Sequence, residues 1–184
     1  MIIIYLLLSV FLFIFAAIFL ILISTRIIET FTTDAPFVSV PDNIENDIVK
    51  NLKLTTGSVL YDLGCGDARI LKRALDSQPN MRAVGIEIAF LPYLLAKFFT
   101  RKYKQIEIKR EDIFQTDIKD ATHIFLYLYT PVVSKLINNI KDQCRPGTRI
   151  VSCDFEIQSC VPIEIIDLKN KRSRLGQKLL VYEI

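Results

Sequence analysis

The chain begins with a run that contains no charged side chain, from Ile2 to Ser24. As a helix, such a run rises about 1.5 Å per residue and spans roughly 34 Å, which is enough to cross the hydrocarbon core of a bilayer. No face of the run is polar, so it does not fit the pattern of an amphipathic helix on a soluble core. The run therefore predicts a transmembrane anchor over residues 1–26.

A cleaved signal peptide is the alternative interpretation of this run. Signal peptides begin with basic residues, have a shorter apolar stretch and end in a small-x-small cleavage site, and this sequence has none of these features. Arg26 follows the run and no basic residue precedes it, which favours a single-pass protein whose C-terminal part faces the cytoplasm. Residues 27–41, which include Pro36 and Pro41, predict a short extended connector.

The cysteines and the charge narrow the class of protein further. Four cysteines occur without a C-x-x-C pair, and His123 is the one histidine. This set is typical of buried thiols in the cytoplasm or an equivalent reducing compartment, and it predicts no metal site. The formal net charge of +3 is small, so we expect no nucleic-acid partner.

Residues 42–184 alternate short β-rich runs with segments of helical periodicity. This alternation predicts an α/β domain with a Rossmann-like sheet of seven strands, mostly parallel, that ends in an antiparallel hairpin. The expected strands cover residues 58–62, 82–87, 105–109, 123–129, 148–155, 163–168 and 178–184, and the expected helices cover residues 42–52, 68–75, 90–103 and 132–140.

A glycine turn follows the first expected strand, with Gly64 and Gly66 on either side of Cys65. Glycines let the backbone turn tightly and approach a ligand, and the next helix offers unpaired N–H groups. An ordinary strand-to-helix turn would look the same. A dinucleotide fingerprint would have a third glycine where Arg69 stands, so NAD is the weaker interpretation.

Three acidic positions follow expected strands near this turn. Asp62 ends the first strand, where a carboxylate needs a cationic ligand or backbone donors as partners. Glu87 ends the second strand, where a carboxylate can accept both hydroxyls of a ribose. Asp112 follows the third strand and suits an adenine amino group, although a solvated acidic turn explains it equally well.

These residues resemble the first motifs of class I S-adenosylmethionine-dependent methyltransferases. More narrowly, the soluble part resembles the small broad-specificity protein-lysine methyltransferases of archaea and their membrane-anchored mitochondrial relatives, which modify ATP synthase subunit c and the adenine nucleotide translocase. The matching stretches are residues 36–41, 61–70, 84–88, 120–122, 146–152 and 155–157.

The resemblance implies S-adenosylmethionine as cofactor and transfer of its methyl group to a lysine of a membrane or membrane-associated protein. It implies a cofactor site made of Asp62, Gly64, Cys65, Gly66, Asp67, Glu87, Ile88, Asp112, Ile113 and Tyr127. It implies a substrate site made of Phe37, Pro41, Tyr129 and Thr130, although Phe37 and Tyr129 could equally pack at the sheet edge. No catalytic base stands out.

The chain departs from the family pattern at Ala68, Phe37 and Pro131, where a glycine, a tyrosine and an asparagine are usual. Two alternatives therefore stay open: a methyltransferase for a lipid or other small membrane substrate, and a non-catalytic adaptor that retained the fold. The basic stretch of residues 169–178 fits a solvated hairpin or a contact with anionic headgroups.

Overall fold

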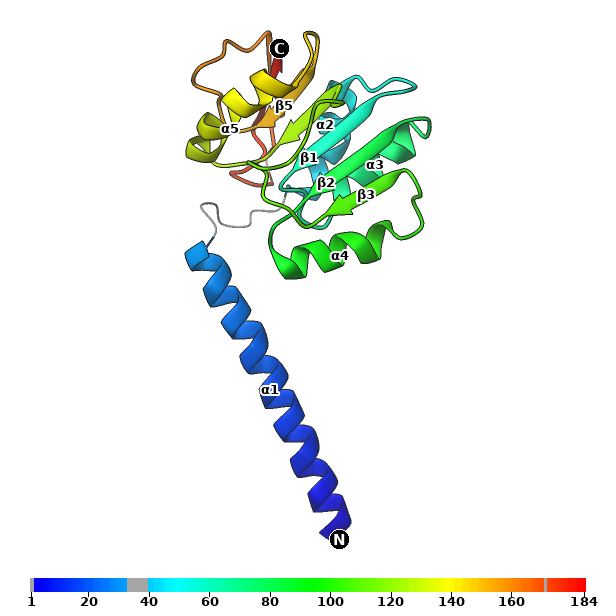
Figure 1. The fold of residues 1–184 in the computed structure, drawn as a ribbon, viewed down its shortest axis with the longest axis vertical. Coiled ribbons are helices and arrows are strands. Elements are labelled where there is room, and N and C mark those ends of the chain that lie inside the picture. Colours follow the sequence, from blue (N-terminus) through cyan, green and yellow to red (C-terminus); the bar gives the residue numbers. More distant parts are fainter. Residues whose placement is uncertain (1, 33–39, 171) are drawn as a thin grey trace. The chain divides into compact units, whose positions relative to one another are not determined.

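The computed structural model describes residues 2–32, 40–170 and 172–184, and the chain divides into two units, Met1–Pro36 and Phe37–Ile184. The first unit is helix α1 (Ile2–Thr32), drawn in blue in Figure 1. Among the described residues, one segment, Ile2–Ser24, is long and apolar enough to cross a membrane by length and composition. The prediction of an extended connector was wrong for residues 27–32, because no proline or glycine interrupts the helix before Pro36.

The second unit contains the predicted seven-stranded sheet, with strand order β3-β2-β1-β4-β5-β7-β6. The five strands β1 to β5 are mutually parallel, and β7 runs antiparallel to both β5 and β6. The predicted fold class is therefore confirmed. The strands are β1 (Val59–Leu63), β2 (Arg82–Ile86), β3 (Ile106–Lys109), β4 (His123–Leu126), β5 (Arg149–Cys153), β6 (Glu164–Asp167) and β7 (Lys178–Glu183).

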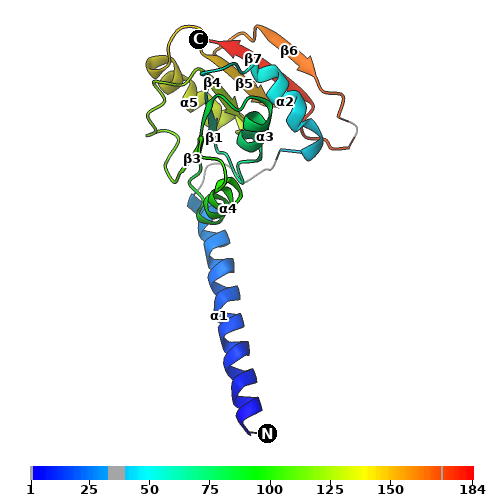
Figure 2. The same ribbon diagram turned by 90° about the vertical axis from the view of Figure 1, so that its right-hand side faces the viewer.

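Helices cover both faces of this sheet, as Figures 1 and 2 show. Alternate residues of each strand face opposite sides, so Leu60 joins one hydrophobic core and Tyr61 the other. The core that contains Leu60 also takes residues of α2, α3 and α4, and the core that contains Tyr61 takes residues of α5. The helices are η1 (Asp42–Ile44, a 3-10 turn), α2 (Glu45–Leu52), α3 (Arg69–Ser77), α4 (Phe90–Thr100) and α5 (Thr130–Gln143).

The boundary between β4 and α5 differs from its prediction in a way that shapes the site. We expected a strand over residues 123–129, but β4 ends at Leu126 and α5 begins at Thr130. Pro131 favours this early start, because a proline in the first helical turn needs no N–H partner. Residues 127–129 are thus a loop at the carboxyl end of β4. This loop lies at the point where the strand order reverses between β1 and β4, which is where doubly wound sheets bind ligands.

Candidate functional site

The turn after β1 is held in an unusual backbone conformation. Gly64, Gly66 and Ala68 have φ angles of +90°, +56° and +61°. The N–H groups of Gly64 and Cys65 both donate to the carbonyl oxygen of Ile86 in β2, at 2.8 and 2.9 Å. A side chain at Gly64 would place its Cβ 3.0 Å from the side chain of Leu128, so glycine keeps this position open. The turn thus forms a cradle against the carboxyl ends of β1 and β2.

Asp62 lies in β1 beneath this cradle, paired in register with Gly85 of β2 and Phe125 of β4. Its side chain is almost fully buried and lines a pocket above the strand ends. Burial, together with the negative charges of Glu87 and Asp67, raises the pKa of Asp62 to about 8. A buried acid in such a place favours a ligand that brings positive charge, because that charge would stabilise the ionised carboxylate.

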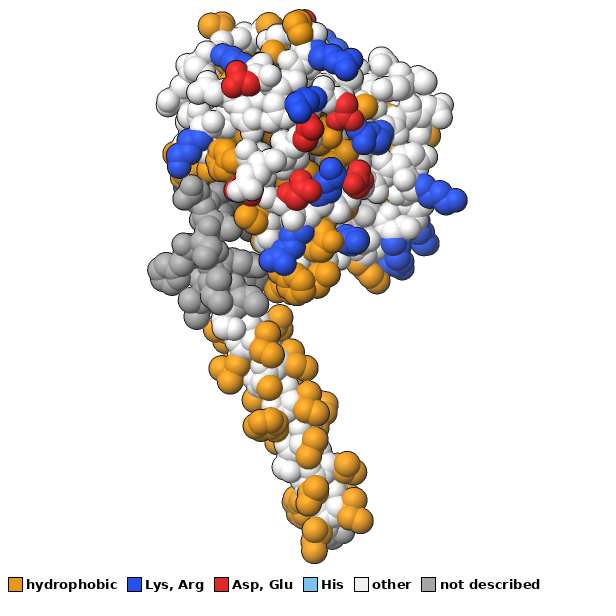
Figure 3. All heavy atoms as spheres, in the orientation of Figure 1, with side chains coloured by type: hydrophobic (Ala, Val, Ile, Leu, Met, Phe, Trp, Pro, Cys, Tyr) orange, Lys and Arg blue, Asp and Glu red, His pale blue; other side chains and the backbone are white. Residues whose placement is uncertain are grey.

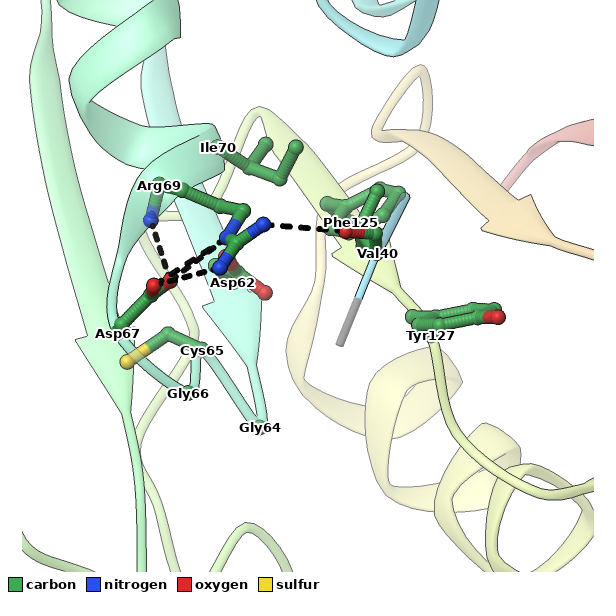
Figure 4. Close-up of a pocket in the computed structure, with 10 residues that line it drawn as sticks. All are labelled: Val40, Asp62, Gly64, Cys65, Gly66, Asp67, Arg69, Ile70, Phe125 and Tyr127. Carbon is green, nitrogen blue, oxygen red and sulfur yellow. Dashed lines mark hydrogen bonds and ion pairs between the residues drawn. The ribbon is translucent and has the colours of Figure 1, made fainter. Parts of the chain in front are cut away.

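Arg69 closes one side of the same pocket, as Figure 4 shows. Its guanidinium donates to both carboxylate oxygens of Asp67, with Nε to Oδ1 at 3.0 Å and Nη2 to Oδ2 at 2.8 Å. Burial works to raise the pKa of Asp67, but the hydrogen bonds and charge of Arg69 outweigh burial and lower it. Nη1 of Arg69 also donates to the carbonyl of Val40 and to Asp42, which ties the segment before α2 to the cradle.

Glu87 reaches the cradle from the end of β2. Its Oε2 accepts the N–H of Gly66 at 3.0 Å, and its Oε1 accepts the N–H of Ala89 at 2.9 Å. Glu87 is buried and shapes the turn through these bonds.

Aromatic side chains form the opposite side of the pocket, at the end of β4 (Figure 4). The Tyr127 ring lies 5.7 Å from that of Phe155, and the Tyr129 ring lies 5.3 Å from that of Phe155, measured between centroids. The hydroxyl of Tyr127 is buried and has no hydrogen-bond partner among the described residues. A buried hydroxyl of this kind at a pocket wall is suited to a ligand that supplies the missing partner.

The structure brings together part of the predicted cofactor site. The pocket is lined by six of the predicted residues, Asp62, Gly64, Cys65, Gly66, Asp67 and Tyr127. Glu87 contacts the same turn through Gly66, whereas Ile88 is exposed beside it. Asp112 and Ile113 lie in the turn after β3, where Asp112 Oδ1 accepts the N–H of Phe114 at 3.0 Å. Neither of these two residues lines the pocket.

Of the predicted substrate residues, Tyr129 and Thr130 lie at the start of α5, and the Tyr129 side chain is half exposed. Pro41 immediately precedes η1 and is partly buried. Phe37 lies outside the described residues. Among the described residues, no group of three or more His, Cys, Asp or Glu side chains could hold a metal ion.

Sequence reasoning missed several residues of the site. Arg69 was considered only as a residue that disfavours a dinucleotide, whereas its side chain pairs with Asp67 and forms a pocket wall. Phe155 follows β5 and was predicted only as the end of a strand in a stretch that resembles the family, because its contacts with Tyr127 and Tyr129 depend on the pairing of β5 with β4. The other missed residues that line the pocket are Val40, Ile70 and Phe125.

Comparison with known proteins agrees with this geometry. The sequence matches the ANTKMT methyltransferase domain over residues 62–164, a stretch that contains Asp62, Glu87, Tyr127 and Phe155. It is also 30% identical over 144 residues to a curated protein-lysine N-methyltransferase of Saccharolobus islandicus (strain REY15A). That match covers 77% of this chain and 89% of the relative.

Solved structures show the same fold. An RNA methyltransferase of Salinibacter ruber in complex with S-adenosyl-L-homocysteine has a TM-score of 0.73 and 31% identity, covering 80% of this chain and 94% of that one. A methyltransferase of Geobacter sulfurreducens, also with S-adenosyl-L-homocysteine, has a TM-score of 0.55 and 17% identity, covering 62% and 49%. A tRNA methyltransferase of B. subtilis has a TM-score of 0.63 and 16% identity, covering 80% and 67%.

Proposed function

The chain belongs to the ANTKMT methyltransferase family, and on that premise we propose that it methylates lysine side chains of membrane proteins while anchored in the same membrane. It is an S-adenosylmethionine-dependent methyltransferase of class I. Beyond this class of enzyme, we propose the lysine acceptor, the membrane anchor and the roles of individual residues. The observation that carries the lysine acceptor is the identity of 30% to a protein-lysine N-methyltransferase over 89% of that relative's length.

The residues of the pocket fit the cofactor. Bound S-adenosylmethionine supplies a methyl group on a positively charged sulfur, where it is open to attack by a nucleophile. The buried carboxylate of Asp62 suits a ligand with positive charge, and the open cradle at Gly64 and Gly66 admits the ligand close to the backbone. The buried Tyr127 hydroxyl offers a further contact. Cys65 and Asp67 complete this wall of the proposed cofactor site.

We assign the ribose to Glu87, because its buried carboxylate lies at the carboxyl end of β2 and holds the cofactor turn through the N–H of Gly66. We assign the adenine to the neighbouring edge of the sheet, near Ile88 and the turn that holds Asp112 and Ile113. Asp112 follows β3, whose last residue pairs with Ile86 at the end of β2. The carboxyl ends of these two parallel strands therefore lie side by side.

For the acceptor, we assign the aromatic surface of Tyr127, Phe155 and Tyr129, together with Thr130. A lysine ammonium has a pKa of about 10.4 and must lose its proton before it can attack. Aromatic walls lower that pKa, because they remove water from the charged form. Alignment in a closed site then accounts for most of the rate, so the chain needs no dedicated base. Pro41 and Phe37 stay predicted members of this substrate site.

The anchor is the segment Ile2–Ser24, which exposes apolar side chains along its length. An exposed helix of this kind is stable in a bilayer and not in water. The anchor would hold the domain of residues 42–184 close to one membrane surface, which raises the effective concentration of membrane proteins over soluble ones. Arg26 favours the cytoplasmic side, or an equivalent reducing compartment, for that domain.

An RNA acceptor is the second candidate, because the Salinibacter ruber structure is described as an RNA methyltransferase and is 31% identical to this chain. To separate the candidates, the full chain in vesicles is incubated with methyl-labelled cofactor and separate pools of membrane protein, soluble protein, RNA and lipid. The control is Asp62→Asn, which removes the proposed cofactor carboxylate. Label on membrane protein, absent with the control, is the expected result; label on the RNA or lipid pool alone would overturn the proposal.

A further inference from the structure

Helix α4 turns an apolar surface toward solvent. It contacts the sheet through a narrow stripe of buried residues, Pro92, Ala96 and Thr100, which recur every four residues. On the opposite side, Phe90, Leu94 and Phe98 recur with the same spacing and are 44%, 43% and 58% exposed. The α4 patch, as we name it, consists of Phe90, Leu94, Leu95, Phe98 and Phe99.

Single exposed apolar side chains are normal on a soluble protein, but five neighbouring ones on one helix are not. The exposure follows from the helix composition, because α4 is apolar around most of its circumference while only its small residues face the sheet. Exposure of a patch of large aliphatic and aromatic side chains to water is unfavourable. Such a patch marks a surface that contacts another protein or a membrane.

Basic side chains border the α4 patch, and acidic ones are absent from this stretch of sequence. No Asp or Glu occurs from Ile88 to Gln105, whereas Lys97, Arg101, Lys102 and Lys104 do. The Arg101 guanidinium carbon lies 4.0 Å from the centroid of the Phe98 ring, and that of Arg110 lies 5.2 Å from the Phe90 ring. Figure 3 shows hydrophobic side chains at the lower edge of the domain with Lys and Arg side chains beside them.

We propose that α4 is an interfacial helix that lies on a bilayer containing anionic lipids, as a membrane contact separate from the N-terminal helix. The combination favours a bilayer, because the aromatic and aliphatic side chains can enter the acyl boundary while Lys and Arg meet the headgroups. Long basic side chains that already lie against aromatic rings can keep their charges at the lipid surface. This inference rests on the proposed anchor, which brings the domain to a membrane.

The position of α4 links this contact to the site. The helix begins at Phe90, three residues after Glu87, and Oε1 of Glu87 accepts the N–H of Ala89 at 2.9 Å. The start of α4 and the cofactor turn therefore share one carboxylate, which also accepts the N–H of Gly66. A bilayer under α4 holds the carboxyl edge of the sheet near the headgroups. Lysines close to the membrane surface are then the acceptors within reach.

The sequence contains no tryptophan, so one introduced indole reports on its own surroundings. Phe98→Trp in the full chain is reconstituted in vesicles of phosphatidylcholine and phosphatidylserine in which the lipids carry bromine near the headgroup. The matched control is Val161→Trp, at an apolar residue that is 89% exposed in the connection between β5 and β6. We expect bromine to reduce the emission of the Phe98→Trp variant by about twofold or more and to leave the control unchanged, because only α4 enters the interface.

Removal of charge gives a second readout. In the same reconstituted Phe98→Trp chain, Lys102→Gln weakens the contact of α4 with the anionic bilayer by about fivefold, since one basic residue contributes about 1 kcal/mol, and bromine quenching is expected to fall accordingly. Quenching that is equal in the two indole variants, or absent from both, would overturn the proposal. Absent quenching with self-association of the chain in detergent would assign the patch to a second copy instead, which also overturns it. The readout needs neither cofactor nor acceptor, so its failure is distinct from a failure of lysine methylation.

Discussion

The side-chain oxygen Oε2 of Glu87 accepts a hydrogen bond from the backbone N–H of Gly66 at 3.0 Å. The two residues belong to different β-α connections, so this bond fixes the turn after β1 against the end of β2. The same carboxylate accepts the N–H of Ala89, the residue before α4. One side chain thus sets the shape of the cradle and the start of the next helix.

Replacing Glu87 therefore affects both cofactor binding and stability. We expect Glu87→Ala to weaken S-adenosylmethionine binding by at least about tenfold, since each charge-assisted hydrogen bond contributes about 1.5–3 kcal/mol. The variant also leaves two backbone N–H groups without an acceptor, so its free energy of unfolding falls by about 1–3 kcal/mol. Calorimetric titration and denaturant unfolding measure the two effects. Glu111→Ala, at an exposed carboxylate on the same edge, is the control that should leave both quantities unchanged.

Asp62 predicts a dependence of stability on pH. Its pKa is raised from 3.8 to about 8 by burial and by the charges of Glu87 and Asp67, so the folded protein holds a proton that the unfolded chain releases. The resulting stability is complete below pH 4 and is lost as the pH rises through 8. Asp62→Asn does not ionise there. We expect the variant to become progressively more stable than the wild type between pH 5 and 8, by up to about 1.4 kcal/mol per unit; parallel unfolding curves would contradict this.

The same carboxylate predicts a dependence of cofactor affinity on pH. A cationic ligand favours the ionised form of Asp62, so binding below the pKa of about 8 releases a proton. Affinity for S-adenosylmethionine should rise with pH up to about 8 and then level off. Calorimetry in two buffers of different ionisation enthalpy measures the released proton directly. A pH-independent affinity would remove Asp62 from contact with the charged part of the ligand.

A side chain at Gly85 of β2 would disturb the packing beneath the cradle. A Cβ added at this residue would lie 2.7 Å from Sγ of Cys65 and 2.8 Å from side-chain carbons of Ile108 and Leu71. Overpacking of this kind costs about 1–3 kcal/mol, so we expect Gly85→Ala to lower both stability and cofactor affinity. Adding Cys65→Ala removes the closest of these contacts and should restore part of both. No gain in the double variant would show that the turn does not depend on this contact.

At saturating cofactor, we expect activity to vary with pH through the acceptor. Saturation removes the pH dependence that Asp62 gives to cofactor binding. A free lysine amine with a pKa of about 10.4 must be deprotonated before it attacks, so the initial rate at subsaturating acceptor should rise from pH 7 to 9. A carboxylate acceptor would give no such rise. The measurement is the initial rate of methylation of one membrane-protein substrate between pH 7 and 9. As a control, enzyme that has been kept at each pH is returned to pH 7, where it should regain its activity.

The pattern of short apolar runs and helical segments predicted the sheet, since strand alternation and helix periodicity are local properties. Asp62, which lines the pocket, could be singled out from the sequence as well, because a carboxylate at the end of an apolar strand needs a partner. The contact of Phe155 with Tyr127 and Tyr129 was not predictable, because strand order and pairing decide it. The exposed face of α4 was not predictable either. The sequence of an apolar helix is typical of a core helix, and only the packing on the sheet shows which of its residues are buried.

Ala68 illustrates the limit of motif comparison. The family usually has glycine there, and the structure gives Ala68 a φ of +61°, in the left-handed region that favours glycine. The alanine methyl is nevertheless fully buried in the core beside α3. Burial of one methyl group contributes about 0.8 kcal/mol, which offsets part of the roughly 1–2 kcal/mol that a left-handed conformation costs. The sequence alone shows the departure from the family at Ala68, but neither its backbone conformation nor the packing around it.

Lysine methylation of membrane proteins is tested most directly by mass spectrometry of lysines in membrane fractions. Cells that carry the wild-type chain are compared with cells that carry Asp62→Asn and with cells that lack the gene. We predict one or more membrane-protein lysines that are methylated with the wild-type chain and unmodified in the other two, with the modification lost when that lysine is replaced by arginine. Identical lysine methylation in all three membrane fractions would contradict the account.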